Sequence, residues 1–118
     1  MMRRFLLGLA FALALLMGAP VSAQTWVERP AAEDFERYYP AWALWFGVEG
    51  RVRLQCVVGA GGEMTDCRVL EETPAGWGFG AAALRLTQHF RASETMADGR
   101  SMIGGRINIP IRFQVTAD

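Results

Sequence analysis

Residues 106–115 read RINIPIRFQV and carry the most regular pattern in this 118-residue chain. Apolar side chains fill every second position, at Ile107, Ile109, Ile111, Phe113 and Val115, and mostly polar ones fill the others. Such alternation is typical of a β-strand with one buried face. Pro110 has no backbone N–H to donate to a neighbouring strand, so a proline is tolerated mainly at the edge of a sheet. We therefore predict that this segment is the final strand and lies at a sheet edge.

A β-hairpin is predicted upstream of this strand. Residues 50–58 alternate with Val52, Leu54, Cys56 and Val58 on one face, and a second run places Thr65, Cys67 and Val69 on one face. The glycine-containing stretch 60–63 separates the two runs and is typical of a turn. With the turn centred between Gly61 and Gly62, the residue numbers of each pair sum to 123. The predicted inward pairs are Val58 with Thr65, Cys56 with Cys67, and Leu54 with Val69.

The register predicts a disulfide between Cys56 and Cys67. Antiparallel partners have Cα atoms about 4.5 to 5.5 Å apart, which a disulfide tolerates. A redox pair is disfavoured because the spacing is unlike Cys-x-x-Cys and no basic residue is expected beside the sulfurs. Zinc binding is also disfavoured, since two thiols and the single His89 leave a four-ligand site incomplete.

Two helices are predicted around the hairpin. The first is a short helix over 41–46 that follows Pro40 and stops at Gly47, with an apolar face of Leu44, Trp45 and Phe46. The second is an amphipathic helix of about three turns, whose apolar residues are Phe79, Ala82, Ala83, Leu86 and Phe90. The predicted fold is α+β: helix, hairpin, helix and strand form a small three-stranded antiparallel sheet with the helices packed on one face.

The first 23 residues are predicted to be a signal peptide. A positive start is followed by an apolar run over residues 5–17 and by Val21, Ser22 and Ala23, so we expect cleavage before Gln24. An uncleaved inner-membrane anchor is the alternative. The expected organisation is 1–23 signal peptide, 24–39 lead-in segment with one helical turn, and 40–118 folded domain.

Composition and residue inventory argue against several classes of function. The chain has 12 basic and 12 acidic residues, and this even balance gives no general attraction to nucleic acid. All the basic residues are arginine, which excludes a Schiff-base or P-loop lysine. His89 is interpreted as a polar helix residue, and Ser93, Ser101, Glu94 and Asp98 as polar residues of a long loop. No enzyme, cofactor or metal site is therefore expected.

The order of these motifs resembles the TonB C-terminal domain family from about Tyr39 to Val115. The matching stretches are Tyr39-Pro40 with Ala43, Val48-Glu49-Gly50-x-Val52, the turn Gly61-Gly62, Phe79-Gly80-Ala81-Ala82-Ala83-Leu84, Asp98-Gly99, and Gly105 to Phe113. The proline that the family carries shortly after the helix is replaced by Arg91, Ala92 and Ser93. The family's membrane helix and long proline-rich spacer have no counterpart in residues 24–39, so force transmission is not expected.

The resemblance implies a periplasmic domain associated with TonB-dependent transport. Its partner would be an outer-membrane TonB-dependent receptor or another TonB-system protein, bound by β-strand addition to the last strand. The residues expected to present that strand are Arg106, Asn108, Pro110, Arg112 and Gln114. Membrane contact is expected only through an uncleaved signal segment.

A structural or self-associating cell-envelope protein with the same fold is the alternative. Trp26, Trp42 and Trp77 are predicted to be exposed, and aromatic side chains are enriched in protein interfaces. A homodimer formed across the same strand edge belongs to this alternative.

Overall fold

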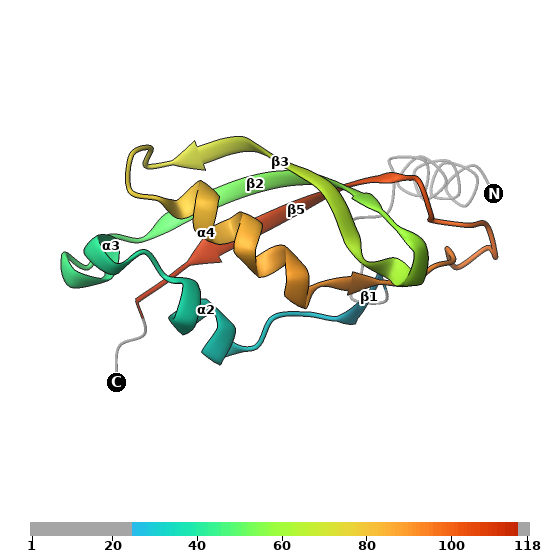
Figure 1. The fold of residues 1–118 in the computed structure, drawn as a ribbon, viewed down its shortest axis with the longest axis horizontal. Helices are drawn as coiled ribbons and strands as arrows, with labels where there is room; N and C mark the ends of the chain where they lie inside the picture. The colour runs from blue at the N-terminus through green and yellow to red at the C-terminus, as the bar shows by residue number, and fades with distance from the viewer. Residues whose placement is uncertain (1–24, 116–118) are drawn as a thin grey trace, which may run out of the picture.

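The computed structural model describes residues 25–115, and the predicted signal peptide and its cleavage site lie outside the described residues. The elements, in chain order, are β1 (Trp26–Glu28), α2 (Ala32–Tyr38), α3 (Ala41–Trp45), β2 (Gly50–Val58), β3 (Met64–Thr73), α4 (Phe79–Leu86), β4 (Arg91–Ala92) and β5 (Arg106–Phe113), with short 3-10 turns at Ala60–Gly62 and Thr87–His89 (Figure 1). Within this part of the chain, no helix has the length and apolar character that a membrane crossing requires.

The main sheet has three antiparallel strands in the order β3-β2-β5. β2 is therefore central, and β5 lies at an edge with β2 as its one neighbour among the described strands, as Pro110 predicted. A separate two-stranded sheet pairs β1 with β4. The predicted α+β architecture is confirmed, with β1 and β4 as additions to it.

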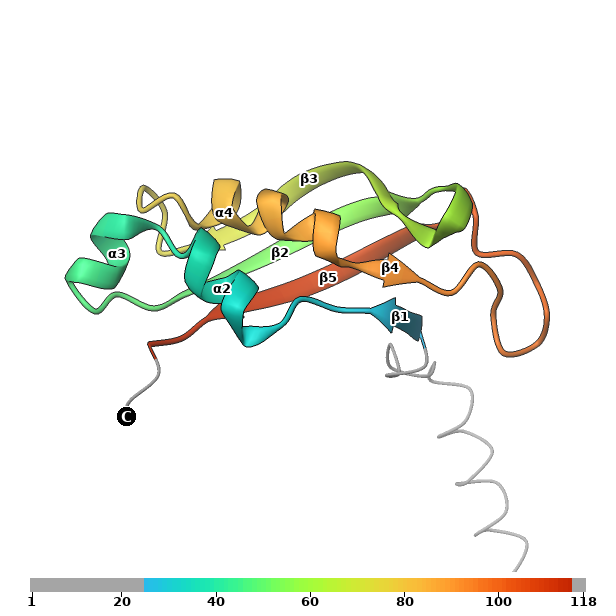
Figure 2. The same ribbon diagram turned by 60° about the horizontal axis from the view of Figure 1, so that its bottom comes forward.

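One face of the main sheet is buried beneath α4 and α2 (Figure 2). Its strands contribute Val52, Leu54, Cys56 and Val58 from β2 and Ile107, Ile109, Ile111 and Phe113 from β5, all buried. Phe79, Ala82, Ala83 and Leu86 of α4 are buried against them, and Phe90, which was assigned to the same helix, is buried in extended backbone just beyond the 3-10 turn. Val115, which was assigned to the inward face, lies beyond β5 and is 39% exposed. Alternating burial in two strands and a helical stripe thus meet in one core.

The apolar face predicted for the short helix is wrong. Ala43 is the buried residue of α3, whereas Leu44, Trp45 and Phe46 are 49%, 79% and 64% exposed. The helix has only five residues and packs through its smallest apolar side chain, so its large ones project outward. Trp42 is also exposed, as predicted.

The other two tryptophans expected at the surface are partly buried. Trp26 packs on Phe90 with ring centroids 4.7 Å apart. Trp77 packs against the core and meets the ring of Phe46 edge-on. A position in a loop or in the lead-in segment therefore did not leave these side chains exposed to solvent.

The hairpin register holds at the centre and fails near the turn. Leu54 faces Val69 as predicted, but Thr65 pairs with Val57, and Val58 pairs with Met64. Two bulges cause the shifts, one on each side of the Leu54 region. Asp66 lies in the second of them with a φ of 51°, which reverses the side-chain alternation there. Thr65 is consequently exposed, and Met64 packs against the core instead.

The segment before Pro40 contains more structure than the single helical turn expected. β1 pairs with β4, and the ring of Phe35 in α2 meets Phe113 edge-on at a centroid distance of 5.7 Å. β4 occupies the position where the family resemblance lacked its proline. It also approaches the hairpin turn: Gly62 has a φ of 81°, and a β-carbon there would collide with the carbonyl of Ala92.

Candidate protein-binding edge of the sheet

The register between β2 and β5 decides which backbone groups of β5 remain free. It runs without a shift from Gly50 opposite Phe113 to Val57 opposite Arg106. In the same register, the Val58 N–H donates to the Gly105 carbonyl at 2.9 Å. Because hydrogen-bonded and non-hydrogen-bonded pairs alternate, odd-numbered residues of β5 bond to β2. Even-numbered residues direct their N–H and C=O groups to the open edge.

The predicted strand residues lie on this open edge. Arg106, Asn108, Pro110 and Arg112 are all exposed on β5, and Gln114 is exposed just beyond its end. Their side chains also share the outer face of the sheet, opposite the buried isoleucines. Pro110 lacks a donor only towards the open edge, so the ladder to β2 is complete despite it. The edge offers donors on either side of Pro110 and an uninterrupted row of carbonyl acceptors.

An apolar groove runs beside the carboxyl end of β5. It has a volume of about 340 Å³, and its apolar lining comes mainly from Phe35, Tyr39, Leu44 and Val115. Arg112 and Gln114 line the same groove, so it adjoins the open edge. An extended chain added to this edge would place alternate side chains towards the groove.

Tyr39 fixes the wall of the groove. Its hydroxyl donates to the Val48 carbonyl at 2.7 Å, and its ring meets Phe113 and Phe79 edge-on. Burial, and then the negative charge of Glu49, raise the pKa of this phenol above its usual value. Glu49 in turn accepts the Val115 N–H at 2.9 Å and so holds the chain just after β5.

The outer face of the sheet concentrates positive charge. Five of the arginines project from it, namely Arg51, Arg53, Arg68, Arg106 and Arg112. Arg51 and Arg112 are direct cross-strand partners and line a cleft of about 410 Å³ together with Glu71, Thr73 and Pro110. Arg53 has a carboxylate neighbour, Glu71, at 3.7 Å. Among residues 25–115, neither Arg51 nor Arg112 has an ion-pair partner.

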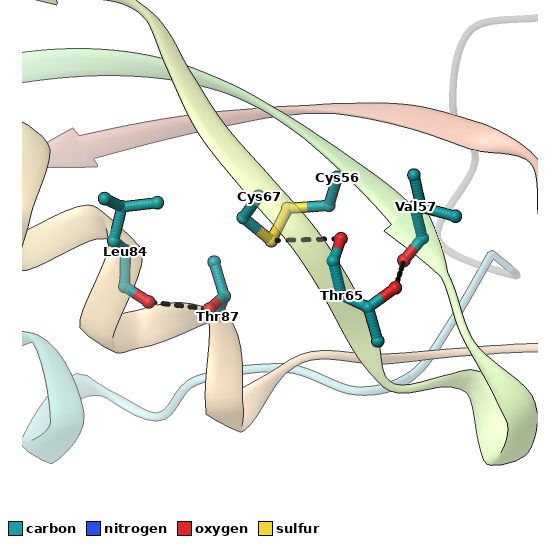
Figure 3. The surroundings of a disulfide bond; sticks show 6 residues. All are labelled: Cys56, Val57, Thr65, Cys67, Leu84 and Thr87. Carbon is teal, nitrogen blue, oxygen red and sulfur yellow. Dashed lines mark hydrogen bonds between the residues drawn. A yellow bond between two sulfur atoms is a disulfide. The ribbon is translucent and has the colours of Figure 1, made fainter.

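The predicted disulfide is present between Cys56 and Cys67, with Cα atoms 4.0 Å apart (Figure 3). Cys56 is fully buried and the bond ties β2 to β3 beside the second bulge. The Thr65 hydroxyl donates to the Val57 carbonyl at 2.9 Å across the same pair of strands. The Sγ of Cys67 lies 3.8 Å from the Thr65 carbonyl oxygen. This contact is not a hydrogen bond, because a disulfide sulfur carries no proton to donate. The disulfide therefore fastens β3, the strand at the other edge of the sheet from β5, to the central strand β2.

His89 lies in a polar cluster between α4 and α2. Its Nε2 lies 3.2 Å from the Tyr38 hydroxyl and 3.7 Å from Asp34 Oδ1, and Gln88 donates to the same hydroxyl at 2.8 Å. Asp34 also accepts the Ala31 N–H at the start of α2. These contacts dock α2 onto the helix that follows the hairpin.

The polar loop residues bond within the loop. Ser93 Oγ donates to the Thr95 carbonyl, and Ser101 Oγ accepts the Ile103 N–H. Hydrogen bonds from the Arg100 backbone and guanidinium, together with its charge, hold the pKa of Asp98 below its usual value. In residues 25–115, no group of three or more His, Cys, Asp or Glu side chains is arranged to hold a metal ion.

Sequence reasoning missed the residues that other elements bring to this edge. Arg51 was assigned to an outward face, but its position opposite Arg112 depends on the pairing of β2 with β5, which no sequence pattern supplied. Phe35 stood in the predicted lead-in, and Leu44 was expected to be buried. The apolar Phe35 three positions before Tyr38 was the one available signal for a helix face there.

A family model and a relative of known sequence both match most of this chain. Residues 36–115 match the family described as Gram-negative bacterial TonB protein C-terminal. A relative from Caulobacter vibrioides, described as an uncharacterized protein, is 32% identical over 108 residues, which cover 91% of this chain and 95% of the relative.

Two solved structures of low sequence identity share the fold. The solution NMR structure of the Pseudomonas aeruginosa TonB CTD matches with a TM-score of 0.54 and 21% identity, over 86% of this chain and 96% of that one. The TonB2 protein of Vibrio anguillarum matches with a TM-score of 0.53 and 19% identity, over 85% and 92% of the two chains.

Proposed function

Because the chain belongs to the family of Gram-negative bacterial TonB protein C-terminal domains, we propose that it is a periplasmic interaction domain that binds a partner segment by strand addition to β5. The partner is an outer-membrane TonB-dependent receptor or another TonB-system protein. No catalytic role is part of this proposal. The observation that carries it is the open edge of β5, where the backbone groups of the even-numbered residues find no strand partner within residues 25–115 while the odd-numbered residues anchor the strand.

Strand addition suits this edge for two physical reasons. Main-chain hydrogen bonds give affinity, and alternate side chains of the added strand reach the groove and the outer face. The edge is also rigid, because Ile107, Ile109 and Ile111 are buried beneath it. Binding therefore costs the conformational entropy of the partner segment but little conformational entropy of the domain.

An NMR titration with TonB-box peptides tests the proposal. We expect shifts in the amide signals of Asn108 and Arg112, whose N–H groups face the open edge. Arg112→Pro removes one of these donors without removing a bond to β2, and should weaken binding by about tenfold or more. Arg112→Gln is the matched control, since it changes the same side chain and keeps the N–H.

Two results would count against the proposal. An absence of shifts with every peptide, or equal binding by Arg112→Pro and Arg112→Gln, would mean that the free backbone of β5 is not the binding element. The periplasmic assignment has a separate check: the mass of the product from the periplasmic fraction should correspond to a chain that begins at Gln24.

Self-association is the second candidate, favoured by the aromatic side chains that α3 exposes. Trp42 and Trp45 are 71% and 79% exposed, and the ring of Trp42 stacks on that of Phe46. Large exposed aromatic residues are enriched at protein interfaces. A stable dimer in analytical ultracentrifugation that is lost in Trp42→Ser and that ignores the peptides would support this candidate over strand addition.

A further inference from the structure

The two faces that an added strand would meet at the end of β5 differ in chemistry. On the inner side lies the apolar groove of Phe35, Tyr39 and Leu44. On the outer side lies the cleft that Arg51 and Arg112 line. The side chains of any extended peptide alternate between these two sides.

The pairing of Arg51 with Arg112 is unfavourable unless an anion is present. The two residues face each other in a non-hydrogen-bonded pair, where the Cα atoms of antiparallel strands are closest. Like charges directly opposite one another destabilise a sheet. Their neighbour Arg53 lies near the carboxylate of Glu71, but Arg51 and Arg112 have no ion-pair partner in the described part of the chain.

Two acidic side chains, Glu49 and Glu71, line pockets beside this pair, but Glu71 lies 3.7 Å from Arg53 and Glu49 accepts the Val115 N–H. The outward residues of β2 and β5 include Arg51, Arg53, Arg106 and Arg112 but no aspartate or glutamate. The chain as a whole has equal numbers of basic and acidic residues. The positive charge of this face therefore comes from where the arginines are placed and not from an excess of basic residues in the chain. A partner that covers it must supply negative charge to offset the desolvated guanidinium groups.

We propose that the partner strand at β5 alternates acidic and apolar residues, with a carboxylate over the Arg51–Arg112 pair and the neighbouring apolar side chain in the groove. The residue opposite Arg112 shares its face and meets both guanidinium groups. The residue beside it, opposite Phe113 or Ile111, points inward to Phe35 and Leu44. Arg106, six positions along β5, meets a second carboxylate on the same face. This inference rests on the proposed function, since it assigns the chemistry of the strand that β5 recruits.

Synthetic peptides of about ten residues that alternate Val with Glu, Val with Gln or Val with Lys separate the two proposals. We expect the purified protein to bind the Val/Glu peptide about tenfold more tightly than the Val/Gln peptide, with Val/Lys the weakest. A peptide with its Glu residues in one block and its Val residues in another has the same charge without alternation, and should bind at least about tenfold more weakly than Val/Glu.

The variant Arg51→Gln/Arg112→Gln should reduce the preference for Val/Glu over Val/Gln from about tenfold to about threefold, the part that Arg106 supplies, with the affinity for Val/Gln unchanged. The matched control is Arg29→Gln/Arg85→Gln, which removes the same charge from two exposed residues outside the sheet and should keep the preference for Glu.

Each result has one meaning for the proposal. If the wild type binds all alternating peptides equally, the acidic preference is wrong and strand addition stands. If the block peptide binds as well as Val/Glu, general electrostatic attraction replaces the proposed alternation. If no peptide binds, strand addition fails and this inference fails with it.

Discussion

The two edges of the main sheet are built differently. β5 pairs with β2 in an unbroken register over eight residue pairs, from Gly50–Phe113 to Val57–Arg106. β3, at the opposite edge, pairs with the same strand through two register shifts, a left-handed residue at Asp66 and a disulfide. The same central strand therefore supports one straight edge and one distorted edge.

This difference bears on where a partner strand can add. Bulges bend a strand and increase its local twist, and proteins use them to keep edges from pairing with other chains. The β3 edge has that protection. On β5 the protection is limited to one proline and to charged outward side chains, which favour selected partners over uncontrolled pairing. The distortion of the β3 edge therefore favours β5 as the edge to which a partner strand would add.

The largest effect should come from a charge beneath the regular edge. Ile109 is 2% exposed and lies opposite the fully buried Leu54. Ile109→Asp leaves a carboxylate unpaired in the core and should lower the free energy of unfolding by more than about 4 kcal/mol, enough to unfold a domain of this size. Urea denaturation followed by circular dichroism measures it.

Asn108→Asp is the control, because it places the same group on the outward face of the same strand, one residue away. It should change the free energy of unfolding by less than about 0.5 kcal/mol. Similar unfolding midpoints for the two variants would refute the assignment of the inward face of β5.

Loss of the disulfide should act through the distorted edge and leave the regular one intact. The bond spans a sequence separation of 11 residues. Cys56→Ala/Cys67→Ala should lower the free energy of unfolding by about 2.5 to 3 kcal/mol, chiefly because the unfolded chain regains the freedom of a closed loop. Reduction of the wild type should give a similar loss, and the variant should not respond to reductant.

Partner binding sharpens this prediction. If β5 is the binding strand, peptides that bind the wild type should bind the folded double alanine variant with unchanged affinity. A large loss of affinity would place part of the binding site on β3.

Sequence patterns predicted the parts of the fold that depend on local periodicity. Alternation identified β2 and β5, and helical spacing identified the buried stripe of α4. Pro110 alone indicated an edge, because a missing donor is a local property with one structural consequence. The cysteine pair was also correct, since Leu54 and Val69 fix the register immediately beside it.

The remaining features depend on long-range packing that the sequence does not express. Asp66 adopts a left-handed conformation, which is usually signalled by a glycine or an asparagine, and position 66 holds neither. The bulge and the outward orientation of Thr65 were therefore not predicted. The site was predicted only along β5 itself. Its groove and its second arginine come from α2, α3 and β2, and their positions follow from how three separate segments pack.

A smaller effect is expected where Tyr39 supports the end of β5. Tyr39→Phe keeps the ring against Phe113 but leaves the Val48 carbonyl without its donor, which should lower the free energy of unfolding by about 1 kcal/mol at pH 7. The pKa of Tyr39 is raised in the folded state, so its contribution is complete below the unfolded pKa of about 10. It is lost as the pH rises through the higher folded pKa.

The difference between the wild type and Tyr39→Phe should therefore shrink in urea denaturation at pH 11. A constant difference from pH 7 to pH 11 would show that the phenol does not titrate differently in the two states.

Amide hydrogen exchange resolves the two edges without changing the stability. The N–H groups of Ile107, Ile109 and Ile111 bond to β2 and should exchange slowly, whereas those of Asn108 and Arg112 face solvent and should exchange fast within the same strand. β3 should lack so regular an alternation, because its bulges shift the pattern twice. When a peptide binds, the amide exchange of Asn108 and Arg112 in particular should become slower. Equal protection of consecutive amides along free β5 would mean that its outer ladder is already paired, and the proposed binding edge would be lost with it.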